Sequence, residues 1–312
     1  MADGLLGGVL PYIYSRADAL KRTLGNVVSN PMASVEQVVG NANDRARVLN
    51  QLQAQVASQG INGLTSPQGQ ELANLYAQSY NPTGIFIGSK AKIWNKANAE
   101  KFLDLELQGL SPIEIWKKTG TFRTPDGVLK QEIPDNFARL RADFNAAIAN
   151  KANDYKSGIE GEIGGMLQHS ELFKAYPDLL QNLRYTVNKQ PDWLPESAAG
   201  AQYSKTFGGK EKISTSTKTE EDALSKLMHE LQHAVQTREG WQSGGLESQF
   251  KDTPQMSAFD KYRTLAGEVE ARAVQARRTM TPEQRQETFP LSNYDLPIES
   301  VIYGDPFGNT TR

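Results

Sequence analysis

The residues with the clearest chemical potential are two histidines that flank a glutamate at a fixed spacing. His229 and His233 lie four residues apart in the segment 227–236, and Glu230 follows the first of them. Residues i and i+4 share one face of an α-helix, so both imidazoles can reach one ion. An imidazole nitrogen coordinates a zinc ion (Zn2+) at a distance of about 2.0–2.1 Å. A carboxylate beside the ion can take a proton from a water molecule bound to it. The chain has only three histidines, so two of them in one HExxH motif favour a metal site over coincidence.

The flanking residues predict the helix that this spacing requires. Thr219 suits the N-cap and Gly240 the C-terminal end of a helix over 220–238. An apolar stripe recurs there at the helical period. It consists of Leu224, Leu227, Met228, Leu231 and Val235. The two histidines lie off this stripe, which argues against a pair of core histidines and leaves a solvated pair as the alternative to a metal site.

A catalytic zinc ion needs a third protein ligand and one open position. A third histidine would have to be His169, which precedes the predicted strands, and the chain has no cysteine that could bind as a thiolate. A later helix, predicted over 257–280, carries Glu268 and Glu270. These two carboxylates point to different flanks of the helix, so only one can face the metal, and the residue pattern alone leaves both open.

The elements around the motif predict an α+β fold. Strands are expected at 183–187, 198–206 and 211–217, and we expect them to form a small antiparallel sheet beside the motif helix. Upstream, the sequence predicts elements at 84–88 (strand), 99–108 and 112–119 (helices), 122–133 (hairpin), 135–154 and 159–168 (helices). Three carboxylates in this region, Glu114, Asp126 and Glu132, are expected at the surface.

Three regions follow along the chain of 312 residues: a helical N-terminal arm over 1–80, a small mixed segment over 84–155 that packs on the next region, and the metal-binding domain over 156–312. The arm is expected to pack on the rest of the protein or on copies of itself. Membrane contact through residues 5–14 is the alternative. The net charge of −2 gives no general attraction for nucleic acid, so no nucleic-acid partner is expected. No apolar run reaches the roughly 20 residues of a transmembrane helix, and no basic region precedes Leu5, so we expect neither a membrane span nor a signal peptide.

The motif and the later helix together resemble the gluzincin metallopeptidases. In that group a Glu-x-x-Ala pattern on a following helix supplies the third ligand, and the resemblance selects Glu268, with Glu270 as the alternative. The group has Asp or Asn four residues after this glutamate, whereas this chain has Arg272. The support that such a residue gives to a ligating histidine must then come from elsewhere.

A closer resemblance spans residues 84–305. Its motifs lie at 84–92, 115–120, 169–178, 229–240 and 265–272, with an Asp-Gly hairpin after the second. They are similar to a zincin domain of bacteriophage and prophage proteins, found within large polyvalent virion-associated polypeptides. The resemblance implies a zinc metallopeptidase with His229, His233 and Glu268 as ligands and Glu230 as the catalytic base.

The same resemblance implies a peptide or protein substrate, other virion proteins as partners, and a place in the phage virion or the host cytoplasm. A substrate would pair with a strand edge at 198–204 or 211–217, and its oxyanion would meet Tyr262, Arg272 or Tyr294. The alternative function is a structural virion or ejection protein that retains a zincin fold without catalysis.

Overall fold

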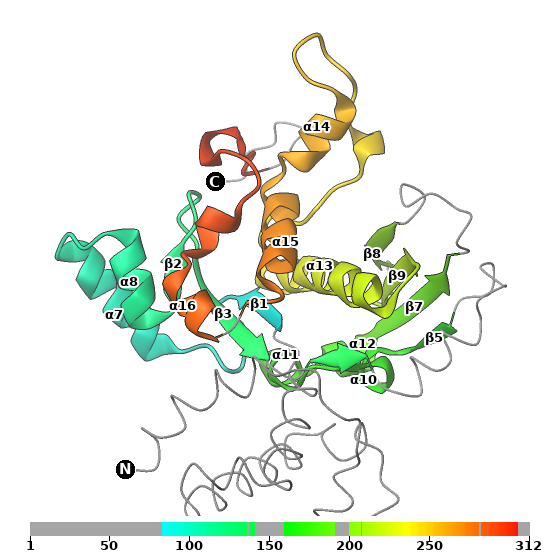
Figure 1. Ribbon diagram of the computed structural model, residues 1–312, viewed down its shortest axis with the longest axis horizontal. Helices are drawn as coiled ribbons and strands as arrows, with labels where there is room; N and C mark the ends of the chain where they lie inside the picture. The colour runs from blue at the N-terminus through cyan, green and yellow to red at the C-terminus, as the bar shows by residue number, and fades with distance from the viewer. Residues whose placement is uncertain are drawn as a thin grey trace, which may run out of the picture. The chain divides into compact units, whose positions relative to one another are not determined.

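The computed structural model describes residues 83–135, 138–140, 159–190, 200–206, 208–280 and 282–304 (Figure 1). They belong to two compact units. The larger unit comprises residues 82–135, 144–166 and 171–312, and the smaller comprises residues 1–81, 136–143 and 167–170. The predicted arm over 1–80 and the predicted boundaries at 80 and 155 lie outside the described residues.

A four-stranded sheet in the larger unit has the strand order β5-β7-β9-β8. Its strands are β5 (Ile159–Glu162), β7 (Leu183–Lys189), β8 (Ala201–Lys205) and β9 (Glu211–Thr217), so the last three confirm predicted strands. The sheet is mixed, where an antiparallel one was expected, because β7 and β9 are parallel. The reason is that β8 takes the outer edge and the antiparallel β8–β9 hairpin returns the chain between β8 and β7.

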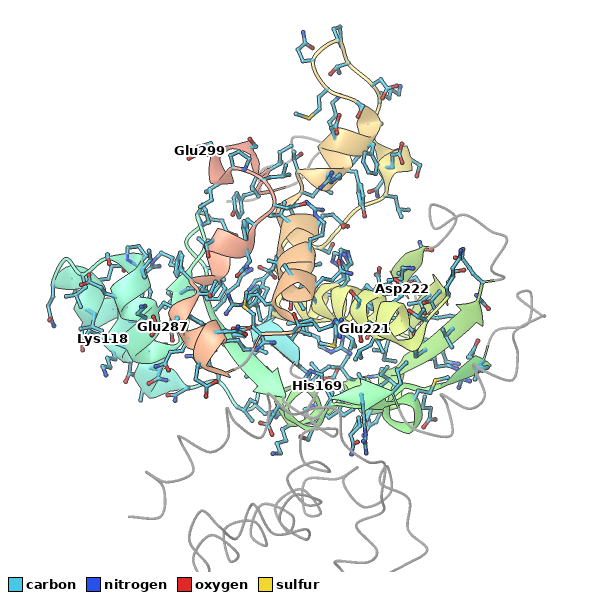
Figure 2. The ribbon with its side chains drawn as sticks, in the orientation of Figure 1. Lys118, His169, Glu221, Asp222, Glu287 and Glu299 are labelled. Carbon is cyan, nitrogen blue, oxygen red and sulfur yellow. The ribbon has the colours of Figure 1, made fainter. Side chains whose placement is uncertain are left out.

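Helix α13 (Glu220–Glu239) carries the HExxH motif and begins and ends as predicted. The Thr219 side chain accepts a hydrogen bond from the backbone N–H of Asp222 at 3.1 Å, and Gly240 closes the helix with a φ of 77°. The predicted stripe is buried throughout, and the helix packs on β8 and β9 (Figure 1). Glu221 and Asp222 stand at its first turn (Figure 2), where the helix dipole favours carboxylates.

The single helix predicted over 257–280 is instead two helices, α14 (Ala258–Arg263) and α15 (Ala266–Arg277). The break has a distant cause. The backbone of Ile302 pairs with the chain there, with its N–H donating to Thr264 O at 2.8 Å and its carbonyl accepting from Ala266 N at 2.9 Å. Leu265 is therefore extended and buried rather than helical. Helix α15 then packs against α13 (Figure 1).

The segment over 83–135 forms a three-stranded antiparallel sheet with two helices. Its elements are β1 (Thr83–Ile87), α7 (Lys96–Leu107), α8 (Pro112–Thr119), β2 (Thr121–Arg123) and β3 (Leu129–Asp135), with the strand order β1-β3-β2. The predicted strand, helices and hairpin are confirmed here. Helix α8 begins with a capping box between Ser111 and Glu114. Strand β1 packs against both α13 and α15, so this segment contacts the two helices that carry the predicted metal ligands.

Two predicted helices are wrong where the structure describes them. Residues 159–168 form β5, the short helix α10 (Ile163–Met166) and β6 (Leu167–Gln168), and the glycines at 161, 164 and 165 weaken any longer helix. Within the predicted helix 135–154, Arg139 and Leu140 form β4, which pairs with β6. Residues 141–154 lie outside the described part.

The remaining described elements are short. They are α11 (Ser170–Ala175), α12 (Leu179–Asn182), η2 (Glu247–Gln249), α16 (Pro282–Glu287), η3 (Pro290–Asn293) and η4 (Ile298–Ser300). Of the carboxylates expected at the surface, the Glu132 side chain is only 3% exposed and pairs with Arg277 of α15 and Arg285 of α16. Among the described residues, no helix combines the length and apolarity needed to cross a membrane.

Candidate metal centre

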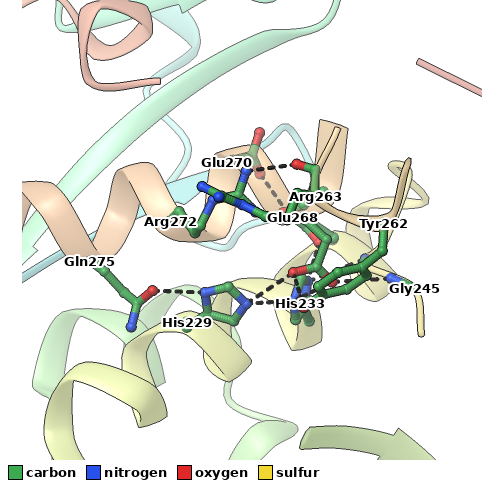
Figure 3. Close-up of polar contacts among 12 residues, drawn as sticks. His229, His233, Gly245, Tyr262, Arg263, Glu268, Glu270, Arg272 and Gln275 are labelled. Atoms are coloured by element: carbon green, nitrogen blue, oxygen red, sulfur yellow. Dashed lines mark hydrogen bonds and ion pairs between the residues drawn. The ribbon is translucent and has the colours of Figure 1, made fainter. Parts of the chain in front are cut away.

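Three side chains from α13 and α15 converge on one point. His229 Nε2 lies 3.1 Å from His233 Nε2, 3.3 Å from Glu268 Oε2, and His233 Nε2 lies 3.4 Å from Glu268 Oε1 (Figure 3). One ligand atom from each of the three residues lies within 4.8 Å of the others. The structure therefore brings together the three residues that the sequence selected as metal ligands.

Two glutamines orient the two imidazole rings. Gln275 donates from Nε2 to the Ser225 carbonyl at 3.2 Å, which leaves its Oε1 to face His229 Nδ1 at 3.0 Å. Gln236 donates from Nε2 to a carbonyl and a carboxylate of α15, and its Oε1 faces His233 Nδ1 at 2.8 Å. An amide oxygen only accepts, so each Nδ1 is placed to donate to its glutamine, and each Nε2 faces the cluster. Both imidazoles thus have the orientation of a metal ligand.

The cluster as a whole consists of electron-pair donors that face one another. Two Nε2 lone pairs and a carboxylate would repel unless a proton or a cation lay among them. Burial lowers the pKa of His233, but the hydrogen bond and charge of Glu268 outweigh it and raise that pKa to about 9. Burial raises the pKa of Glu268, yet its hydrogen bonds with the two histidines bring that pKa well below the usual range. Two nitrogens and a carboxylate oxygen are a donor set that fits zinc.

Glu268 and Glu270 have separate surroundings, which distinguishes the two alternatives left by the sequence. Glu268 accepts hydrogen bonds from Tyr262 OH at 2.9 Å and from Gly245 N at 3.1 Å, beside the histidines. Glu270 instead pairs with Lys130 and faces away from the cluster (Figure 3). His169 belongs to the smaller unit and is not a member of the cluster.

Glu230 lies in the same cleft without joining the cluster. Its side chain is buried, and the backbone N–H of Tyr203 in β8 hydrogen-bonds its carboxylate. Burial raises the pKa of Glu230 above its ordinary value, although the nearby histidines oppose the shift. A carboxylate that binds a proton more tightly than usual is better matched to general-base work near neutral pH.

A cleft of about 470 Å³ opens over the cluster, and β8 forms one of its walls. The remaining lining comes from α13, from Tyr262 and Glu268, and from the loop that follows Gly240. Within the described residues β8 is the outer strand of its sheet, so one of its edges lies beside the cleft. Strand β9, the other edge considered from sequence, is an interior strand.

The loop after α13 approaches the cluster so closely that it needs glycine. A Cβ on Gly244 would overlap Oε1 of Glu268 and come within 2.5 Å of His233 Cε1. A Cβ on Gly267 would collide with the backbone of Ser243 in the same loop. The loop is therefore part of the wall around the cluster, as its hydrogen bond from Gly245 also indicates.

We expect Gly244→Ala to weaken metal binding while leaving the fold intact. The added methyl group must displace Glu268 or His233, and a misplaced ligand costs about 10–100-fold in affinity, like the loss of a supporting contact. The matched control is Gly165→Ala, since a Cβ there meets nothing within 4 Å. Zinc affinities of the two variants, measured by competition with a chromophoric chelator, should differ by at least tenfold, and equal affinities would contradict this geometry.

Two of the three residues considered for oxyanion stabilisation lie away from the cluster. Arg272 binds Asp295 with distances of 2.8 and 3.0 Å, and Tyr294 packs with the hydrophobic cluster around Val269 and Val301. Tyr262 alone lines the cleft. The supporting role that Arg272 cannot fill for His229 belongs to Gln275.

Sequence reasoning missed Gln236 and Gln275, although their spacing carried a signal. Gln236 follows His233 by three residues, and Gln275 follows Glu268 by seven, which is two helical turns. Gln236 therefore lies on the same face of α13 as His233, and Gln275 lies on the same face of α15 as Glu268.

Comparison with known proteins gives one match. Residues 84–141 match the model of a family described as large polyvalent protein associated domain 23. No curated protein and no solved structure matches the chain. The matched residues end before the histidine motif, so the match bears on context and not on metal chemistry. It supports the context of a phage-associated large polyvalent protein.

Proposed function

We propose that this protein is a zinc metallopeptidase, with His229, His233 and Glu268 as the metal ligands. The observation that carries the proposal is the convergence of two imidazole Nε2 atoms and a carboxylate, with both imidazoles oriented through Nδ1 by glutamine oxygens. Three protein ligands leave one position open, which is the mark of a catalytic rather than a structural zinc site.

Zinc held there would lower the pKa of a bound water toward roughly 7 and polarise a carbonyl group. The protein supplies the rest of the chemistry. Glu230 lines the cleft beside the ligands, where its carboxylate takes the proton from the attacking water and then delivers it to the leaving amine. Tyr262 lines the same cleft with its hydroxyl 2.9 Å from Glu268, and it is our candidate for the group that steadies the developing oxyanion.

The substrate class follows from the edge strand. Among the described strands, β8 pairs with β9 alone, and residues 201–205 line the cleft. An extended peptide can add to such an edge through backbone hydrogen bonds, which hold it without requiring a particular sequence. A peptide segment of a protein is thus the substrate we propose.

The second candidate function is a structural virion or ejection protein that keeps this fold without hydrolysis. The match to a domain of large polyvalent proteins favours a phage context but does not distinguish the two candidates. The buried Glu230 favours the enzyme, since a packing role does not require a carboxylate beside an open ligand position. Interactions with other virion proteins remain a proposal under both candidates, as does a place in the virion or the host cytoplasm.

We expect zinc binding to release a proton near neutral pH. His233 has a pKa of about 9, so below that pH it is protonated before the metal binds and must lose its proton to become a ligand. The apparent zinc affinity should therefore rise by up to roughly tenfold per pH unit from pH 7 toward 9 and then level off. Calorimetric titrations in buffers of different ionisation enthalpy would measure the proton, and a binding heat independent of the buffer would contradict the expectation.

The test of the function is a cleavage screen against denatured proteins and peptide libraries. The zinc-loaded protein should cut peptides, a chelator should abolish cleavage, and added zinc should restore it. A zinc-loaded protein that cuts nothing in diverse libraries favours the structural candidate.

A further inference from the structure

A buried ion pair joins the segment that matches the family model to the helix that carries Glu268. Lys130 on β3 contacts Oε2 of Glu270 on α15, and their side chains are 6% and 3% exposed. Replacing a buried ion pair with apolar residues of similar volume is often neutral for stability or better. Stability alone is therefore a weak reason for this pair.

The second oxygen of Glu270 leads to the metal cluster. Oε1 of Glu270 accepts hydrogen bonds from Gln232 Nε2 at 2.7 Å and from Gln236 Nε2 at 3.1 Å. Gln236 then turns its own oxygen toward His233 Nδ1 at 2.8 Å. Because an amide has one donating and one accepting end, an anchor for its nitrogen also directs its oxygen.

The same segment also contacts α13 and the loop that follows it. The backbone of Phe86 on β1 exchanges two hydrogen bonds with the Gln232 side chain, at 3.0 and 3.2 Å. The Lys130 ammonium also lies 3.7 Å from the ring centroid of Trp241, at the start of the loop over the cluster, where a cation–π contact is favourable. Lys130 therefore contacts both Glu270, whose other oxygen binds Gln236, and Trp241 in the loop that follows α13.

We infer that Lys130 is a positioning residue for the metal site, acting on His233 through Glu270 and Gln236. This inference rests on the proposed function. The ammonium holds the buried carboxylate in place, the carboxylate fixes the Gln236 amide, and the amide oxygen orients the His233 ring through Nδ1, so that Nε2 faces the metal site. The segment over 84–135 then contributes directly to the metal-bearing unit rather than forming a separate module.

The test replaces the ion pair by apolar side chains, in the variant Lys130→Met/Glu270→Leu. This change avoids a lone buried charge, so the melting temperature should stay near that of the wild type. Co²⁺ affinity, followed through its visible absorption bands, should fall by about 10–100-fold as for other lost supporting contacts. In the metal-free protein above pH 9, where the His233 ring is neutral, its ¹⁵N signals should shift away from an Nδ1–H tautomer.

Two further variants make the result specific. Gln236→Met breaks the relay nearer the histidine and should give the same loss, which keeps the inference testable if the first variant does not fold. The exposed ion pair Lys117–Glu287 supplies the control Lys117→Met/Glu287→Leu, which should leave Co²⁺ affinity and the ring signals unchanged.

Full Co²⁺ affinity and unchanged His233 signals in folded Lys130→Met/Glu270→Leu would overturn the inference, even if Gln236→Met lost both. Failure of the wild type to bind Co²⁺ would instead contradict the proposed function as a metallopeptidase. The ring signals of the metal-free protein would then still decide whether Lys130 orients His233.

Discussion

Changing Glu230 to glutamine should leave zinc bound and reduce peptide hydrolysis by roughly 10²–10⁴-fold, the usual contribution of a general base. The amide keeps the size of the carboxylate and can still accept the backbone N–H of Tyr203, so the fold should not suffer. It cannot take a proton from water. Initial rates on a cleaved library peptide, together with the zinc content, measure both parts of this prediction.

A matched control for this variant lies on the same helix. Glu221→Gln changes an exposed carboxylate at the first turn of α13, far along the helix from Glu230, and should keep the wild-type rate. Equal rates for wild type and Glu230→Gln, with cleavage still dependent on zinc, would exclude Glu230 as the base. Loss of zinc from Glu230→Gln would instead mean that this carboxylate is itself a ligand.

The second large effect is expected from His229→Ala/His233→Ala, which should abolish stoichiometric zinc binding. Glu268 alone provides one carboxylate, and a single carboxylate in water binds zinc weakly. Zinc should therefore raise the melting temperature of the wild type, since a ligand that binds only the folded state stabilises it. The double variant should show no such rise, as measured by calorimetry with and without added zinc.

The metal-free stability of this variant serves as its control. The change removes the contacts of His229 and the buried His233 with Glu268, but the rest of the core is untouched. The protein should therefore stay folded, and its circular dichroism spectrum should stay that of the wild type. A zinc-dependent rise in melting temperature that persists in the folded double variant would show that the metal binds elsewhere.

Local signals in the sequence predicted much of the fold. The ends of α13 follow from Thr219 and Gly240, whose side chain and backbone conformation act within a few residues. Strands β8 and β9 follow from Gly208 and Gly209, which separate two strand-like runs in the sequence. The parallel pairing of β9 with β7 could not be predicted, because alternation does not determine the order of strands in a sheet.

The errors have causes that are distant in the chain. The helix predicted over 257–280 breaks at Leu265 because Ile302 pairs with the backbone there, and the nearest glycine, Gly267, lies inside α15 rather than at the break. Glu132 was expected at the surface because its partners, Arg277 and Arg285, lie about 150 residues away in sequence and meet it only in the fold.

The candidate site shows the same division between local and distant information. The spacing of His229 and His233 and the position of Glu268 could be read from the sequence and a family resemblance. Glu270 pairs with Lys130, which lies 140 residues earlier, instead of joining the histidines. No pattern within α15 predicts this pairing.

The most direct test of the central claim is the metal content of the purified protein after zinc loading and exhaustive dialysis, measured by elemental mass spectrometry. The metallopeptidase account predicts about one zinc per chain in the wild type, as for a site with three protein ligands and an open position, and background zinc in His229→Ala/His233→Ala. A wild type that retains no zinc, or a double variant that retains a full equivalent, would contradict it.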